Sequence, residues 1–118
     1  MGLFRKKNRE VKPTGEGHSL LTAYDRMKFY AVDEAFDDGA MFELADSVRN
    51  NRPIIVNFAK APVEIVNYAL AFLSGVVYAL DGKVIKTQEK VFLFASGSDY
   101  ADGSLTQYVE DSTEGSLY

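Results

Sequence analysis

The fold is decided by residues 52–94, which read RPIIVNFAKAPVEIVNYALAFLSGVVYALDGKVIKTQEKVFLF. The stretch opens with a short run dense in Ile and Val, over 53–58, which is typical of a strand buried on both faces of a sheet. A long apolar segment follows Pro62, a residue suited to the first turn of a helix. Two short apolar runs, 84–86 and 91–94, predict a pair of strands after the turn at Asp81 and Gly82.

The predicted central helix, Pro62 to Leu80, is apolar on almost every side. Residues 65–80 carry no formal charge, but a bilayer-spanning helix needs roughly 20 apolar residues, so we interpret the segment as a buried helix. Two adjoining stripes are expected to cover the sheet: Val66, Leu70, Leu73, Val77 and Leu80 form one, and Ile65, Ala69, Phe72 and Val76 form the other.

The third stripe of this helix has small residues between tyrosines: Glu64, Tyr68, Ala71, Gly75 and Tyr78. A glycine inside a helix costs about 1 kcal/mol relative to alanine, which favours a role in close approach of another backbone. We therefore predict self-association through Tyr68, Ala71, Gly75 and Tyr78. The alternative is that the helix ends at Ser74 and Gly75 and a strand begins at Val76.

Upstream, alternation over 27–32 predicts a first strand. Asp37 and Asp38 predict the start of a helix, whose apolar residues Met41, Leu44, Ala45 and Val48 keep helical spacing until Asn50 and Asn51. The order strand, helix, strand, helix, strand, strand predicts a small two-layer α/β sandwich with its helices on one face of the sheet. A short helix or strand is expected over 105–109.

The two ends of the chain carry opposite charge. Residues 1–12 hold five basic side chains against Glu10, and beyond Gly97 the charged residues are all acidic: Asp99, Asp102, Glu110, Asp111 and Glu114. We predict a basic tail over 1–24, a globular domain over 25–110 and an acidic tail over 111–118. The acidic balance, a net charge of -4, argues against a nucleic-acid partner.

Catalytic chemistry is poorly represented. The chain has no cysteine and one histidine, His18, in a glycine-rich linker, and it contains none of the phosphate-binding, metalloprotease or nucleophile-elbow motifs. The carboxylates Asp33, Glu34, Asp37 and Asp38 suit a helix start better than acid–base work. We expect no enzyme activity, no cofactor and no metal site.

The hairpin offers surface chemistry instead. Lys83, Lys86 and Lys90 lie on or beside it, near Tyr78 and Phe92. Such a mixture of basic and aromatic groups suits a short peptide with acidic and apolar side chains. The alternative is that the lysines keep an edge strand from pairing while the aromatic residues fill the core.

Several of these segments together resemble the carboxy-terminal core of the SepF family, bacterial division proteins that work with the tubulin-like FtsZ. The resemblance is carried by FLSG at 72–75 and VYALDG at 77–82, by Arg52 with IIVN at 54–57, and by VFL at 91–93. It is continuous over 52–94 and looser from about Lys28.

The resemblance implies a non-enzymatic division protein that acts in septum assembly, in the cytoplasm at the division site and peripheral to the inner face of the cell membrane. It implies dimers and polymers, binding of the carboxy-terminal FtsZ peptide, and membrane tethering through the amino end. Phe92 and Lys86, joined here by Lys83 and Tyr78, would bind the peptide, and Gly75 with its stripe would serve self-association. The membrane-contacting residues would be Leu3, Phe4, Arg5, Lys6 and Lys7.

The chain departs from the family pattern in its short amino end, its short non-acidic linker and the absence of a proline soon after FLFAS. Two other functions therefore stay open. One is a self-assembling structural protein without FtsZ binding. The other is a small-molecule-binding regulatory domain, which small α/β sandwiches often form.

Overall fold

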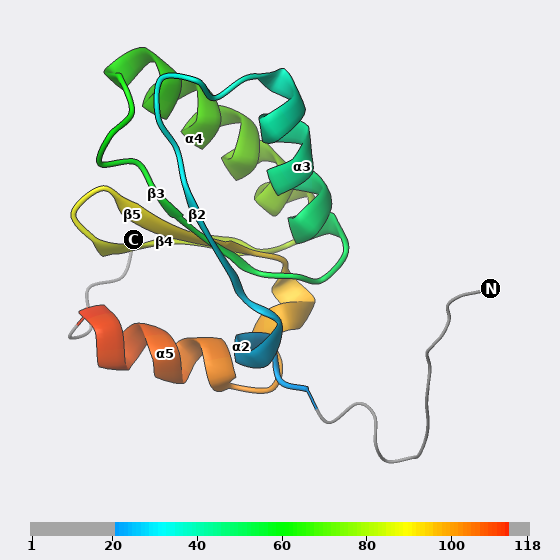
Figure 1. Cartoon of the computed structure of the whole chain (residues 1–118). Coiled ribbons are helices and arrows are strands. Elements are labelled where there is room, and N and C mark those ends of the chain that lie inside the picture. Colours follow the sequence, from blue (N-terminus) through cyan, green and yellow to red (C-terminus); the bar gives the residue numbers. More distant parts are fainter. Residues whose placement is uncertain (1–20, 114–118) are drawn as a thin grey trace.

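The computed structural model describes residues 21–113 and is built on a four-stranded sheet (Figure 1). The strand order is β2 (Lys28–Ala31), β3 (Ile54–Asn57), β5 (Val91–Ala95) and β4 (Lys83–Gln88). β2 and β3 are parallel, as expected for strands joined by a crossover helix, and β5 is antiparallel to both of its neighbours. The predicted order of strand, helix, strand, helix, strand, strand is confirmed.

The first crossover helix, α3 (Asp38–Arg49), begins where its carboxylates predict. The Asp37 side chain accepts a hydrogen bond from the Ala40 N–H at 2.9 Å and so satisfies a free amide of the first turn. The apolar residues predicted from the helical spacing are all buried: Met41, Leu44, Ala45 and Val48. The helix ends at Arg49 with Asn50 as its C-cap, and Asn51 turns the chain toward β3 with a φ of 61°.

The second crossover helix, α4 (Val63–Ala79), runs without a break through Ser74 and Gly75, as predicted, with Pro62 as its N-cap. Ala69, Leu73 and Val77 are buried against the sheet, in one core with Ile54, Val56 and Phe94. Among residues 21–113, no helix combines the length and the apolar content that a membrane crossing requires.

The opposite face of the sheet is covered by α5 (Ser104–Thr113), the carboxy-terminal helix, beside the short α2 (Ala23–Arg26) (Figure 1). Ile55, Leu93 and Ile85 form one row across three strands, and Val109 of α5 packs on that row. The predicted sandwich therefore holds for α3 and α4, and α5 adds a partial third layer. The boundaries predicted at 24/25 and 110/111 fall inside α2 and α5 respectively.

The turn between α4 and β4 requires glycine for its packing. The residue with positive φ there is Asp81 (57°), while a Cβ on Gly82 would collide with the Ala95 carbonyl oxygen and approach Ser96 Cα to 2.9 Å. The same crossing is tied by a hydrogen bond from the Gly97 N–H to the Leu80 carbonyl, at 2.9 Å. Gly82 thus lets the end of α4 lie directly on the end of β5.

Replacing Gly82 with Ala should therefore destabilise the fold by about 2 kcal/mol, because the obstructing atoms belong to the backbone and cannot rotate away. Gly39→Ala in α3 is the matched control, since the nearest neighbouring atom to the added Cβ, Asp37 Oδ1, lies at an ordinary contact distance of 3.5 Å. That change should raise stability by up to about 1 kcal/mol through helix propensity. Urea denaturation measures both, and an unchanged midpoint for Gly82→Ala would contradict the close approach.

Candidate functional site

On the side of the sheet that faces α4, Lys86 and Phe92 are direct partners across β4 and β5. The Phe92 ring is partly buried and lies 5.9 Å from Phe58 and 6.4 Å from Phe94, between ring centroids. The Lys86 ammonium is 3.6 Å from the carboxylate of Glu89, a side chain that is 79% exposed. Because exposed ion pairs contribute little, an incoming carboxylate can replace Glu89 as the partner of Lys86.

The four residues predicted for peptide binding divide between different surfaces. Side chains alternate along a strand, so Lys83 lies on the α5 side of β4 while Lys86 lies on the α4 side. The Lys83 ammonium stands 5.2 Å from the centroid of the Tyr100 ring, whose hydroxyl donates to the Lys83 carbonyl. Tyr78, near the end of α4, is 85% exposed. The structure therefore brings Lys86 and Phe92 together and places Lys83 across the sheet from them.

The outer surface of α3 and α4 carries the stripe predicted for self-association. Tyr68 and Tyr78 are exposed large side chains, and Ala71 and Gly75 between them are also exposed. Phe72, which the stripe analysis assigned to the sheet, instead contacts Phe42 of α3 at 5.9 Å between ring centroids, and both rings are exposed. We call this surface the α3–α4 aromatic face; its residues are Phe42, Tyr68, Ala71, Phe72, Gly75 and Tyr78.

Sequence reasoning did not include Phe42 because it follows Met41 and falls just outside the buried stripe of α3. Its only sequence signal is a phenylalanine at a position expected to be polar.

Tyr68 also bridges the two helices, since its hydroxyl donates to the Asp38 carboxylate at 3.0 Å. That hydrogen bond raises the pKa of Tyr68, because the carboxylate favours the protonated phenol. An exposed apolar face of this kind is typical of a contact surface.

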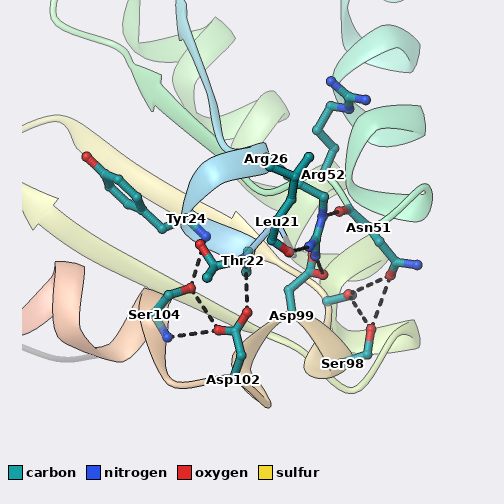
Figure 2. Close-up of polar contacts among 12 residues, drawn as sticks. Leu21, Thr22, Tyr24, Arg26, Asn51, Arg52, Ser98, Asp99, Asp102 and Ser104 are labelled. Carbon is teal, nitrogen blue, oxygen red and sulfur yellow. Dashed lines mark hydrogen bonds and ion pairs between the residues drawn. The ribbon is translucent and has the colours of Figure 1, made fainter. Parts of the chain in front are cut away.

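A polar junction holds α2 against the rest of the protein (Figure 2). The Arg26 guanidinium donates to the Asp99 carboxylate at 2.7 Å, to the Asn51 carbonyl at 2.8 Å and to the Leu21 carbonyl at 3.2 Å. Asp99 belongs to a short 3₁₀ turn, η2 (Gly97–Tyr100), and is buried, with no hydrogen bond to its Oδ2 atom. Burial raises the pKa of Asp99 and outweighs the lowering by Arg26.

Asp102 joins α2 to α5. Its Oδ1 atom accepts hydrogen bonds from the amide and the hydroxyl of Ser104, and its Oδ2 atom accepts from the Ala23 amide at 2.9 Å (Figure 2). The Ser104 hydroxyl accepts in turn from the Tyr24 amide at 3.0 Å. These bonds favour the charged carboxylate and lower the pKa of Asp102. Asp102 therefore positions the helix that covers the second face of the sheet.

Asp102→Asn should lower the free energy of unfolding by about 1 kcal/mol at pH 7, because both carboxylate oxygens accept hydrogen bonds and the amide nitrogen that replaces one of them cannot accept. Because the pKa of Asp102 is lower in the folded than in the unfolded chain, ionised Asp102 stabilises the fold above about pH 4. That contribution disappears as the pH falls through the folded-state pKa. Thermal denaturation at pH 7 and pH 3 should show a difference between the parent and the variant that shrinks on acidification, and an equal difference at both would refute it.

The other carboxylates singled out in the sequence lie at the start of α3. Asp37 caps that helix, and the Asp33 carboxylate accepts from the Ala35 amide at 2.9 Å. Within residues 21–113 there is no group of three or more His, Asp or Glu side chains that could hold a metal ion. His18 and the predicted membrane-contacting residues, Leu3 to Lys7, lie outside the described residues.

Comparison with known proteins identifies a family. Residues 34–98, more than half of the chain, match the family model "Cell division protein SepF". A relative of that name from Lactobacillus gasseri is 34% identical over 68 residues, which cover 58% of this chain and 47% of the relative.

Two other relatives align over more of the chain. One from Heliobacterium modesticaldum is 31% identical over 91 residues, covering 75% of this chain and 55% of the relative. "Cell division protein SepF 1" from Desulforamulus reducens is 30% identical over 110 residues, with 92% and 69% covered. The chain thus spans about half the length of the first two relatives.

Proposed function

The chain belongs to the SepF family of cell division proteins, and from this membership we propose that it is a non-enzymatic division protein acting at the septum. It binds the carboxy-terminal peptide of FtsZ, associates with further copies of itself, and holds FtsZ filaments at the inner face of the cell membrane. Its work is binding and assembly, without a cofactor.

The observation that supports peptide binding is the cross-strand pair of Phe92 and Lys86. Its partly buried ring and its ammonium lie side by side at the β4 edge. An apolar peptide side chain can pack on the ring while a peptide carboxylate pairs with the lysine. The exposed partner of Lys86, Glu89, is readily displaced because it is held only at 3.6 Å and in solvent.

Phe92→Ala should abolish detectable binding of an FtsZ tail peptide by isothermal titration calorimetry, because the apolar contact is lost. Lys86→Glu should weaken binding about tenfold or more, which corresponds to losing a charge-assisted hydrogen bond. Lys83→Glu is the matched control: it makes the same charge change on the same strand but on the opposite face, and it should leave the affinity within about twofold.

Phe92 also packs in the core, so each variant is checked for its circular dichroism spectrum and melting transition. Unchanged affinity in a folded Phe92→Ala protein would remove this residue from the site. Equal losses for Lys83→Glu and Lys86→Glu would point to a general charge effect and not to a site at the β4 edge.

Self-association is proposed to use the α3–α4 aromatic face. Its aromatic side chains are exposed, and Gly75 leaves open space at the centre of the stripe. A second copy seated here would bury four aromatic rings, and burial of one such side chain favours association by about 1.5 to 3 kcal/mol. Glycine and alanine at the centre allow two helices to approach closely.

Ala71→Glu should shift the protein toward the monomer in sedimentation velocity, because it places a carboxylate inside the proposed contact. Ala101→Glu makes the same change at an exposed alanine after η2, on the other side of the sheet, and should leave the sedimentation coefficient unchanged. If both variants behave like the parent, the contact uses a different surface.

The α3–α4 aromatic face also supports the alternative of a structural protein that assembles without binding FtsZ. Filaments or rings by electron microscopy, together with no heat on addition of the FtsZ peptide, would select that alternative.

The other alternative, a regulatory ligand site, is supported by a cavity of about 430 Å³ on the α5 side of the sheet. Its lining includes Phe29, Asn57, Gln88 and Tyr108.

Membrane contact is proposed for Leu3, Phe4, Arg5, Lys6 and Lys7. Two apolar side chains hold one chain weakly, and each basic residue adds about 1 kcal/mol near anionic lipid. Display of many copies on one polymer would strengthen the attachment through avidity.

A further inference from the structure

A groove of about 290 Å³ lies between α2 and α5, on the face of the sheet opposite α3 and α4. Its lining residues are Thr22, Tyr24, Ser104, Gln107, Tyr108 and Asp111. The Tyr24 and Tyr108 rings form an apolar wall, with centroids 5.6 Å apart, and Tyr24 is 49% exposed. Neither peptide binding at Phe92 nor assembly through the α3–α4 aromatic face uses this groove.

The base of the groove is held in place by hydrogen bonds. The Tyr24 amide donates to Ser104 Oγ at 3.0 Å, and Thr22 and Asp25 cap the start of α2 reciprocally. Asp102 ties the two helices together through Ala23 and Ser104. The walls therefore need little rearrangement to receive a ligand, which lowers the cost of binding.

One end of the groove is negatively charged. Asp111 Oδ1 accepts a hydrogen bond from the side-chain amide of Gln107 at 3.0 Å, and the Asp111 side chain is exposed. The charged side chains of α5 are Glu110 and Asp111, with no basic residue along the helix. The basic residue of α2, Arg26, forms an ion pair with Asp99. Tyrosine rings beside an available carboxylate suit an apolar side chain followed by a lysine or arginine.

We propose that this groove binds the chain's own segment Leu3–Lys7. Leu3 and Phe4 match the tyrosine wall, and Arg5, Lys6 and Lys7 match Asp111 in charge. Thr22 itself lines the groove. Residues 3–7 therefore precede, in the same chain, a residue of the groove wall. The 15 peptide units from Lys7 to Thr22 reach about 50 Å when extended, well beyond what the groove requires.

Because the segment and the groove belong to one chain, a low intrinsic affinity is enough for the groove to be occupied. A ligand on a short connection has an effective concentration on the order of millimolar, so a groove with an intrinsic Kd near 1 mM is about half occupied within one molecule. Burial of both the Leu3 and the Phe4 side chains, together with charge pairing at an exposed rim, is of the size that such an affinity requires.

Docking would withhold from lipid the same five residues that are proposed to contact the membrane. The groove and an anionic surface then compete for one segment, and vesicle binding releases it from the groove. This consequence rests on the proposed membrane contact, whereas the docking itself does not.

A tryptophan probe tests the docking in the full chain, which contains no tryptophan of its own. In Phe4→Trp, without vesicles, we expect blue-shifted emission and an acrylamide quenching constant about half that of a free tryptophan, independent of protein concentration. Adding Asp111→Lys should raise the quenching constant about twofold. Glu110→Lys is the matched control, because it changes the charge equally at the next residue, which does not line the groove.

Emission as red and as readily quenched in Phe4→Trp as in Phe4→Trp with Asp111→Lys would overturn the docking. A blue shift that fades on dilution would also overturn it, because it would show binding between molecules. So would a blue shift that Asp111→Lys and Glu110→Lys change equally. A blue shift removed by Asp111→Lys and kept by Glu110→Lys supports it.

Sedimentation with vesicles of phosphatidylglycerol and phosphatidylcholine then separates this inference from the membrane proposal. If membrane contact is correct, Asp111→Lys should bind vesicles about twofold more tightly than Glu110→Lys, because the segment is released. If neither protein sediments with vesicles, the membrane proposal fails, and the fluorescence result still decides the docking.

Discussion

The centre of the sheet is apolar on both faces, and each face must be covered. Along β3, Ile54 and Val56 point toward α3 and α4 while Ile55 points the other way, and all three are buried. On β5, Phe94 and Leu93 divide in the same manner. The two crossover helices, α3 and α4, cover one face, so α5 must cover the other. The hydrogen bonds of Asp102 and Arg26 hold α5 and α2 in place.

This two-sided burial also determines which surfaces remain for partners. α4 packs on β4 and β5, and Phe92 of β5 stays only partly buried beside Lys86 of the edge strand. Because α3 and α4 turn their core stripes inward, Tyr68 and Phe42 stay outside. On the second face, a groove is left between α5 and α2. Three separate surfaces thus follow from a single packing constraint.

Much of the fold could be read from local pattern. The spacing of Met41, Leu44 and Val48 predicted the buried side of α3, and the uninterrupted apolar run predicted that α4 passes through Gly75. Local pattern was wrong for Phe72: its stripe adjoins the buried one, but its ring meets Phe42 of another helix. The Lys83, Lys86 and Tyr78 grouping also relied on proximity in sequence, whereas alternation along β4 sends its two lysines to opposite faces.

The sequence by itself determined the order of elements, the cap at Asp37, the start of a helix near Pro62 and the exposed stripe around Gly75, because these depend on residues within a few positions of one another. Only the tertiary structure decided that α5 covers the second face, that Gly82 must lack a side chain beside Ala95, and that Tyr24 meets Tyr108. Those contacts join residues far apart in the chain, and no local propensity specifies which distant surface a helix will meet.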